Sequence, residues 1–433
     1  MKIKYNSSII YNITLFMIMV SCGLFCIISM PILRSAAMQY SIVFVISVGL
    51  FFNSIINKKI KNATKAYTTY FYILLFYLAI FLFIHCLYGV IKYDQGIRSI
   101  YGAAKYFAYF LMFVPFIYIL ESNNGYETLL KDISIIMLIV AAFKALKALV
   151  YNIAGISILN WFESSIRYGR TRVMLMGFGA LSFIYFTNKL LNSSPKKRNF
   201  YGYLAADLFL IFYILYVDMT RMDIIGYAAT FTVMLIAKKR PKNKQIVSVT
   251  LIIIVAALIL SSGMFENFIE SFSRESDELG LSSVVRDLAR DYFRQFPKSN
   301  ILLGLGFLNP DTAARTAVFF GKDGVYCLDD LGIANMYYHY GILGIILAVL
   351  VLGRMLFCAV NIILSNSKNK LIIIGITVLI ASTQASLCIF DGQRMLNLVL
   401  YWAIFEYEYA QIRKAKPKFK VKKLARPKIT ITT

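Results

Sequence analysis

Long apolar segments recur along the whole chain and constrain its fold more than any other feature of the sequence. A bilayer core about 30 Å thick is crossed by a helix of roughly 20 apolar residues. On that measure the sequence predicts twelve spans, at residues 9–31, 37–56, 67–91, 100–120, 132–152, 171–188, 200–217, 222–237, 246–264, 333–358, 371–390 and 395–411. The expected fold is therefore an all-α polytopic membrane protein.

The amino-acid composition agrees with a membrane bundle. Of the 433 residues, 59% are hydrophobic and 16% are charged, whereas a soluble globular chain has about 45–50% apolar and about 25% charged residues. A water-soluble protein of this size would have to expose the apolar excess as large patches. The composition therefore argues against a soluble enzyme.

The positions of Lys and Arg predict the orientation of the spans. With the N-terminus in the cytoplasm, the cytoplasmic segments hold 27 basic residues and the short external loops hold 8. This bias is the positive-inside pattern, and it places both termini in the cytoplasm. Because topology explains most of the net charge of +24, we expect no nucleic-acid partner. The first apolar run is interpreted as a membrane helix and not as a signal peptide, because further spans follow it.

The spans divide the sequence into four parts. Residues 1–264 hold the first nine spans, residues 265–332 form a long external loop, residues 333–411 hold the last three spans, and residues 412–433 form a basic cytoplasmic tail. We expect the tail to bind anionic lipid headgroups. The loop of 68 residues is too long for a plain connection, so it is either a small folded cap or a functional site.

The long loop contains a predicted amphipathic helix, Val284–Phe296, with a basic stripe. Arg286, Arg290 and Arg294 recur every four residues along it. The stripe is either an exposed face paired with neighbouring aspartates or a clamp on phosphate or pyrophosphate, which the guanidinium fork suits. The Leu-Gly-Leu-Gly sequence at 303–306 predicts a tight turn where the backbone can approach a ligand.

Other charged clusters lie at the external ends of predicted spans. Arg167, Arg170 and Arg172 stand outside, against the positive-inside tendency, so we expect either a bound anion or ordinary interfacial arginines there. Arg221 begins the eighth span within the charged sequence at 218–223. We expect the charges of that sequence to pair with one another or to face a polar cavity.

Several basic residues fall inside predicted spans. Lys144 and Lys147 lie one helical turn apart and cannot both face lipid at low cost. We expect them to pair with Asp207 or to line a polar cavity, with a purely structural ion pair as the plainer alternative. Arg354 lies near the inner end of its span and is expected to extend to the interface.

The segment that enters the tenth span carries Asp329, Asp330 and His339. His339 is either a packed interfacial residue, which is the simpler reading, or a base. The sequence has no Walker motif, dinucleotide fingerprint, HExxH or GxSxG. We therefore expect neither a metal nor another cofactor.

Together these features resemble the bacterial O-antigen polymerase (Wzy) and O-antigen ligase superfamily. The resemblance rests on the number of spans, the large external loop before the last three, the Thr220-Arg221 entry into a span, the Arg286–Gly306 segment that ends in Leu-Leu-Gly-Leu-Gly, and the Tyr-Gly-Ile-Leu-Gly sequence at 340–344. It covers the architecture of the whole chain, while its motifs are confined to two regions.

At Asp330 this chain departs from the ligase pattern. Ligases look to have a His about eleven residues before the Gly-x-x-Gly that starts at Gly341, and this chain has Asp330 there. An acidic residue at that position is more like the polymerases. The resemblance therefore favours a polymerase over a ligase.

The resemblance implies a GT-C-like bundle and a metal-independent, inverting glycosyltransferase. Its reaction would polymerise oligosaccharide repeat units linked to undecaprenyl pyrophosphate into O-antigen or capsular polysaccharide, at the external face of the bacterial inner membrane. The implied partners are the lipid-linked oligosaccharide, membrane lipids and a chain-length regulator protein. Two alternatives stay open: an O-antigen ligase that transfers glycan to lipid A-core, and a lipid-linked oligosaccharide flippase, although flippases usually have two similar halves and short loops.

The resemblance also implies roles for individual residues. Asp330 or Asp329 would orient or deprotonate the acceptor hydroxyl, and Arg221 would act at the reacting centre. The cations expected to bind pyrophosphate are Arg170, Arg172, Arg221, Arg286, Lys144 and Lys147, with Arg290 in reserve. His339 is kept as an additional candidate.

Overall fold

Helices make up almost all of the regular structure. The computed structural model describes residues 2–26, 36–57, 65–159, 162, 164–167, 170–175, 177–194, 198–238, 281–321, 324, 326–365 and 367–415. The elements, in chain order, are α1 (Lys2–Ser21), η1 (Leu24–Cys26), α3 (Ala36–Ile56), η2 (Lys65–Tyr67), α5 (Thr68–Tyr93), α6 (Ile97–Ala104), η3 (Lys105–Met112), α7 (Phe113–Glu121), α8 (Gly125–Ala154), β1 (Ser165–Arg167), β2 (Arg170–Arg172), α9 (Gly179–Asn192), α10 (Arg198–Tyr213), η4 (Ile214–Asp218), α11 (Arg221–Ala237), α14 (Leu281–Ser299), α15 (Ala313–Phe320), η5 (Leu328–Leu331), α16 (Ala334–Ala348), η6 (Val349–Gly353), α17 (Arg354–Ile363), α18 (Lys370–Thr383) and α19 (Met395–Ala415).

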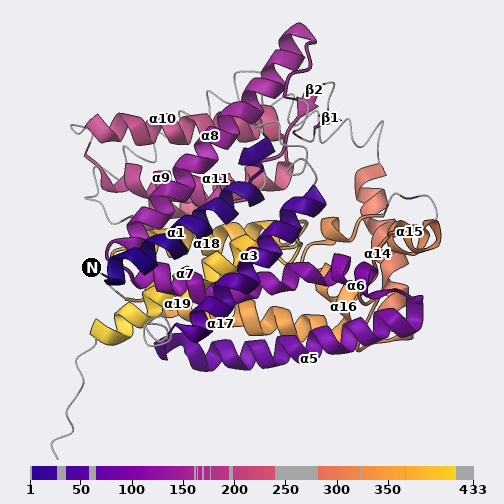
Figure 1. Cartoon of the computed structure of the whole chain (residues 1–433). Coiled ribbons are helices and arrows are strands. Elements are labelled where there is room, and N and C mark those ends of the chain that lie inside the picture. Colours follow the sequence, from indigo (N-terminus) through magenta and orange to yellow (C-terminus); the bar gives the residue numbers. More distant parts are fainter. Residues whose placement is uncertain are drawn as a thin grey trace, which may run out of the picture.

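Long apolar helical segments dominate the bundle (Figure 1). Those in the described residues that are long and apolar enough to cross a membrane are Met38–Ile56, Thr69–Tyr93, Ile97–Glu121, Gly125–Ala154, Arg198–Asp218 and Ala334–Ile363. Ser8–Ser21 and Lys370–Thr383 are shorter apolar helices. Their length and composition indicate a multi-pass membrane protein, in agreement with the composition of the chain.

The prediction of twelve spans is only partly confirmed. The predicted span 246–264 lies outside the described residues. The predicted span 171–188 is wrong at its start, because residues 170–172 form strand β2 and α9 begins only after it. The predicted span 371–390 is too long, because α18 ends at Thr383 and an irregular loop follows. Apolar composition alone does not separate a helix from a loop that its neighbours bury.

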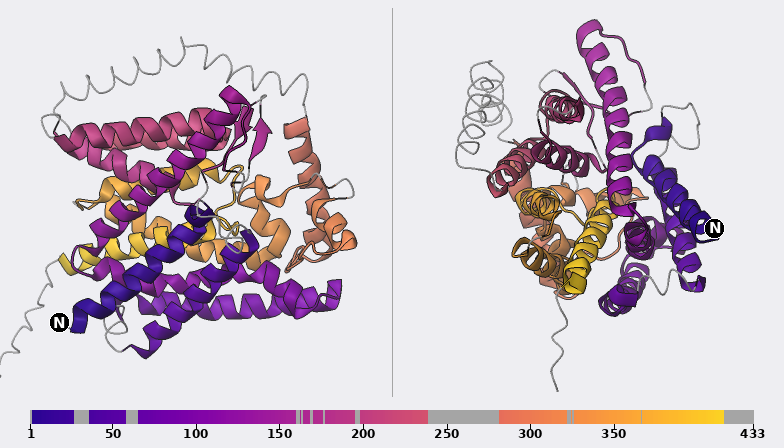
Figure 2. Two further views of the ribbon diagram at one scale, coloured as in Figure 1. Left: turned by 45° about the horizontal axis from the view of Figure 1, so that its top comes forward. Right: turned by 90° about the vertical axis from the view of Figure 1, so that its left-hand side faces the viewer.

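Contacts between the connecting segments gather them at two ends of the bundle. At one end, Lys414 forms an ion pair with Glu121 at 3.1 Å. At the other, Gln95 Nε2 donates to the carbonyl of Phe307 at 2.6 Å. In Figure 1 and in the left view of Figure 2, α14 and α15 lie at the end opposite to the N-terminus. Segments that the charge pattern assigns to the same side of the membrane therefore meet at the same end.

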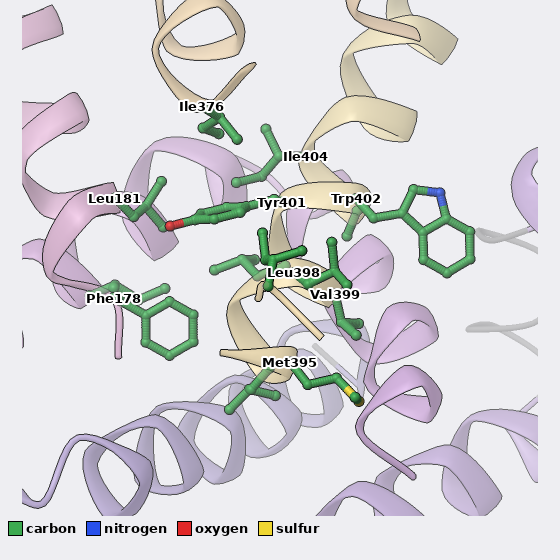
Figure 3. Close-up of a cluster of buried hydrophobic side chains, with 14 of the residues drawn as sticks. Phe178, Leu181, Ile376, Met395, Leu398, Val399, Tyr401, Trp402 and Ile404 are labelled. Atoms are coloured by element: carbon green, nitrogen blue, oxygen red, sulfur yellow. The ribbon is translucent and has the colours of Figure 1, made fainter. Parts of the chain in front are cut away.

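Helix α19 forms the centre of the bundle. It packs against α7, α17 and η3, and the side chains of Met395–Phe405 are all buried. Trp402 stacks on Phe113 with ring centroids 4.0 Å apart. Figure 3 shows Tyr401 directed towards Leu181 and Trp402 on the other side of the helix. This helix therefore packs with α7, α17 and η3 in one hydrophobic core.

The external loop is attached to a break in α16. Gly341 has φ 60° inside that helix, so the helix is interrupted and the N–H groups after the break need other acceptors. Ile342 N–H donates to the carbonyl of Ile301 at 2.9 Å, and a Cβ at Gly304 would lie 2.8 Å from the Gly341 nitrogen. The close backbone approach predicted for this turn is thus made to α16.

Helix α14 confirms the predicted amphipathic helix and covers a second, smaller core. Its buried Ala289 and Phe293 pack with Leu305 and Leu328. The helix contacts both α16 and η5. The described part of the external loop is therefore a small folded cap, which was one of the two predicted alternatives.

Arg354 forms a largely buried ion pair with Glu406, and its predicted extension to the interface stays a prediction. Its Nε and Nη2 donate to the Glu406 carboxylate at 2.6 and 2.9 Å, and the two side chains are 22% and 5% exposed. The guanidinium lies 5.0 Å from the ring centroid of Tyr70. The bidentate carboxylate of Glu406 satisfies the charge of this cation within the protein.

We expect Glu406→Ala to lower the free energy of unfolding by about 3–5 kcal/mol, because it leaves the Arg354 charge buried without its partner. The double variant Arg354→Met/Glu406→Leu should lose much less, since no unpaired charge remains. Both variants remove the acceptor of the Trp402 indole N–H. The difference between their free energies of unfolding therefore reports the cost of leaving the arginine charge without its partner. Denaturant unfolding in detergent, followed by tryptophan fluorescence, measures both free energies of unfolding. Equal losses in the two variants would contradict the role of Glu406 as the partner of the Arg354 charge.

Candidate functional site

A two-stranded hairpin positions Arg172 at the predicted external end. Strands β1 and β2 pair antiparallel, with Ile166 opposite Thr171. The N–H of Thr171 donates to Asn152 Oδ1 at the end of α8, at 2.7 Å, which fixes the hairpin to that helix. Along β2 the side chains alternate: Thr171 is buried, Arg170 is exposed and Arg172 is half-buried.

The turn between α10 and α11 holds Arg172. The arginine Nε donates to the carbonyl of Asp218 and its Nη2 donates to Thr220 Oγ1, both at 2.7 Å. Nη2 also lies 3.9 Å from the Asp218 carboxylate, which accepts a hydrogen bond from the N–H of Leu175 at 2.7 Å. Asp218 therefore pairs with an arginine of β2, whereas the prediction was for pairing within the sequence 218–223 or for a polar cavity; Asp218 and Asp223 both line a cavity. Arg221 begins α11 beside them.

A cavity of about 90 Å³ lies beside this turn, among α9, η4, α11, α18 and α19; we call it the polar cavity for the charged and amide side chains that share its lining with apolar ones. The charged and amide side chains that line it are those of Asp218, Asp223, Gln384, Gln393, Arg394 and Asn397. Asp223 lies within electrostatic reach of Asp218, Arg172 and Arg394. Charged groups that converge on a cavity inside a membrane bundle mark a functional site.

Arg394 links this cavity to a second group of carboxylates. It lies in the irregular loop between α18 and α19, and its Nη1 donates to Asp391 Oδ2 at 3.0 Å. It lies within electrostatic reach of Asp223 on one side and of Asp329 on the other. One guanidinium therefore stands among acids that come from α11, η5 and its own loop.

The close approach of η5 to this loop depends on Gly332. This residue has φ 59°, and a Cβ added to it would lie 2.0 Å from the carbonyl oxygen of Gln384. That oxygen accepts the N–H of Ile333 at 2.9 Å. Only glycine fits both the left-handed backbone and the short separation, so the sequence at this turn brings η5 to the cavity.

Asp329 on η5 is a carboxylate suited to acid–base chemistry. Asp329 is exposed to solvent, with protein atoms packed closely around its carboxyl. Burial and the nearby Asp391 carboxylate raise the pKa of Asp329 to about 7, against the opposing effect of Arg394. Asn335 Nδ2 donates to its Oδ1 at 3.2 Å, and the neighbouring Asp330 is exposed. A carboxyl with a near-neutral pKa can act as a base at physiological pH.

The predicted pairing of Lys144 and Lys147 with Asp207 is wrong. Lys144 Nζ donates to the carbonyl of Met174 at 2.9 Å, and Lys147 Nζ donates to the carbonyl of Phe162. The Asp207 carboxylate instead accepts a hydrogen bond from a threonine of α9 at 3.3 Å. Because Met174 lines the cavity, Lys144 holds one wall of it in place.

The arginine stripe on α14 forms exposed ion pairs. Arg290 lies 2.7 Å from Asp287 and Arg294 lies 3.6 Å from Asp291, with arginine side chains 46% and 57% exposed. Such pairs contribute about 0–1 kcal/mol. Arg286 is half-buried on the same helix, which packs against η5. The simpler interpretation of the stripe, an exposed face paired with aspartates, therefore holds for Arg290 and Arg294.

His339 is a packed residue. Its ring stacks on that of Tyr340, with centroids 4.0 Å apart at 10°, and it meets Phe319 of α15 edge-on at 5.9 Å. The cavity lining does not include it. The simpler of the two predicted readings is thus the one that the packing favours.

The sequence analysis did not select Arg394 and Asp391 as site residues. A usable signal was present, because Arg394 stands in a short loop predicted to be external, against the positive-inside tendency. Asp391 precedes it by one helical turn. The amides of Gln384 and Asn397 carried no such signal, since they face the cavity only through tertiary packing.

Within the described ranges, no group of three or more His, Cys, Asp or Glu side chains is arranged to hold a metal ion. No family model matches the chain. A search of the curated proteins also gives no match. The resemblance to the O-antigen polymerase and ligase superfamily therefore stays a prediction from the sequence.

Replacing the neighbours of Asp329 should move the pKa of its carboxyl in opposite directions. Asp391→Asn removes a like charge and should lower that pKa, whereas Arg394→Gln removes an opposite charge and should raise it. Carbon-13 NMR of aspartate-labelled protein in micelles measures both shifts. The exposed Arg290→Gln variant is the matched control and should leave the pKa unchanged; shifts of the same sign in the two test variants would contradict the arrangement.

Proposed function

We propose that the chain is a polysaccharide polymerase that joins lipid-linked oligosaccharide repeat units beside the polar cavity. The observation that carries the proposal is the near-neutral Asp329 carboxyl, within reach of Arg394, at the same end of the bundle as the folded external cap. Glycosyl transfer to a hydroxyl needs a base and a site that tolerates developing charge. Asp329 and the polar cavity offer these two elements.

In the proposed step, an acceptor hydroxyl attacks the anomeric carbon of the glycan carried on undecaprenyl pyrophosphate. The hydroxyl proton passes to the Asp329 carboxylate as the new glycosidic C–O bond forms with inversion. The bond between the anomeric carbon and the pyrophosphate oxygen breaks, and its electron pair leaves with that oxygen. Asp330 would orient the acceptor, while Arg221 and Arg286 stay proposed contacts of the pyrophosphate.

The proposed setting is the external face of a bacterial inner membrane. Both termini would then be cytoplasmic, and the polymer would be O-antigen or capsular polysaccharide. A chain-length regulator protein is the proposed partner. The length and apolarity of individual helices support a membrane setting, and the positive-inside bias supports this orientation.

Reconstitution of the purified chain with a synthetic lipid-linked repeat unit separates the three candidate functions. A polymerase extends the glycan into a ladder on the lipid. An O-antigen ligase leaves the repeat unit single until lipid A-core is added, and then moves the glycan onto it. A flippase moves the lipid between leaflets and leaves its covalent structure unchanged. A ladder supports the proposal, and either other result would contradict it.

Asp329→Asn should reduce the rate of polymerisation by about 10²–10⁴-fold, because the amide cannot accept the acceptor proton. The matched control is Asp287→Asn, an exposed aspartate of α14 that pairs only with a surface arginine and should retain activity. Glycan chain length on gels, at equal protein expression, measures both. Normal chain length in the Asp329→Asn variant would show that another group acts as the base.

The rate of polymerisation should rise with pH up to about 7 and then level off. Below the pKa of about 7, Asp329 is protonated and cannot take up a proton, so the rate should fall about tenfold for each further pH unit. The initial rate of ladder formation in proteoliposomes, measured between pH 5 and 9, tests this. A rate that stays constant down to pH 5 would rule out a base with this pKa.

A further inference from the structure

Lys105 is a buried cation at the edge of the proposed site. It begins η3, within the apolar segment Ile97–Glu121, and only 7% of it is exposed. Among the residues that the structure describes, no Asp or Glu forms an ion pair with it. Burial of an ammonium group without a counter-charge is unfavourable, so this position needs an explanation.

Three tyrosine rings surround the Lys105 ammonium group. Its Nζ lies 5.3 Å from the ring centroid of Tyr106, 5.7 Å from that of Tyr40 and 5.9 Å from that of Tyr101. The rings come from η3, α3 and α6. Their π faces attract a cation but carry no net charge. The tyrosine cage (Tyr40, Tyr101 and Tyr106) therefore holds the lysine in place and leaves its positive charge available to an anion.

Tyr106 of the tyrosine cage packs against the loop that carries Asp391. A Cβ added to Gly392, in the loop that carries Asp391, would lie 2.6 Å from the ring of Tyr106. Tyr106 also lies within electrostatic reach of Asp391 and Asp329. Tyr106 thus lies next to both Lys105 and the loop that carries Asp391.

The predicted depth of Lys105 in the membrane allows it to contact the charged headgroup of a lipid. It follows the start of the helical segment at Ile97 by roughly 12 Å along the axis. Side chains on a helix point back towards its N-terminus, so the ammonium group is directed to the predicted external surface. Tyrosines are common at this level, where lipid headgroups meet the hydrocarbon.

Two arginines near the polar cavity are already paired with carboxylates. Arg172 lies against the Asp218 carboxylate, and Arg394 lies against that of Asp391. Each is largely neutralised by its partner. Lys105 differs from both because its described surroundings are aromatic and uncharged.

We propose that Lys105, within the tyrosine cage, binds an anionic group of the lipid-linked substrate. The proposal rests on the proposed function. The diphosphate of the carrier and the carboxylate of an acidic sugar share this chemistry. Tyr101 is 36% exposed, so its ring face is available to stack on a sugar while the lysine holds the anion.

The test uses the full chain in detergent micelles and two probes. One probe is a polyprenyl diphosphate without sugar, and the other is a glucuronic acid glycoside without lipid. Binding of each is measured by calorimetry for Lys105→Met, which keeps the shape and removes the charge, and for Lys105→Arg, which keeps the charge. The matched control is Lys92→Met, because Lys92 also lies over two tyrosine rings, 5.0 and 5.4 Å from their centroids, but is exposed.

We expect Lys105→Met to weaken binding of at least one probe by about tenfold or more, with Lys105→Arg and Lys92→Met close to the wild type. The probe whose binding is weakened shows whether the anion is the diphosphate of the lipid carrier or the carboxylate of an acidic sugar. Without probe, Lys105→Met should melt at the same temperature or higher, because it removes a buried charge. Wild-type binding in Lys105→Met, no binding of either probe to the wild type, or a lower melting temperature would overturn the proposal. Ladder formation by the wild type is measured separately and decides the proposed function alone.

Discussion

A charge inside a membrane bundle needs a partner in the protein or in a ligand, and this requirement organises the structure. Arg354 meets it with the bidentate carboxylate of Glu406, and Arg394 meets it with Asp391. The lysines of α8 bind backbone carbonyls. These contacts fix irregular segments between helices, because hydrocarbon offers no alternative partner. The polar cavity exists where several such segments converge.

The sequence predicted the class of the fold and most of its helices, because long apolar runs leave few other choices. It predicted the amphipathic helix of the external loop from periodicity alone. It did not predict that residues 170–172 form a strand or that the chain after Thr383 is irregular. Those features depend on tertiary contacts, such as Thr171 with Asn152, which local composition does not encode.

The site was predicted in part. Asp329 and Arg172 were selected from the sequence. Neither lines the cavity, but Arg172 pairs with Asp218 of its lining and Asp329 lies within electrostatic reach of Arg394 of that lining. The expected cluster of arginines is instead a mixed group in which carboxylates neutralise Arg172 and Arg394. Sequence spacing cannot show this, because the partners come from separate helices. It also cannot show that Lys105 stands among tyrosines of three different elements.

The proposed role of Asp329 is tested most directly by cryo-electron microscopy of the chain with a lipid-linked repeat unit as donor and an acceptor repeat unit. The proposal requires the acceptor hydroxyl within hydrogen-bond distance of the Asp329 carboxylate, and the anomeric carbon of the donor next to that hydroxyl. Glycan density that lies at the opposite end of the bundle, or that leaves Asp329 in contact with solvent only, would contradict it.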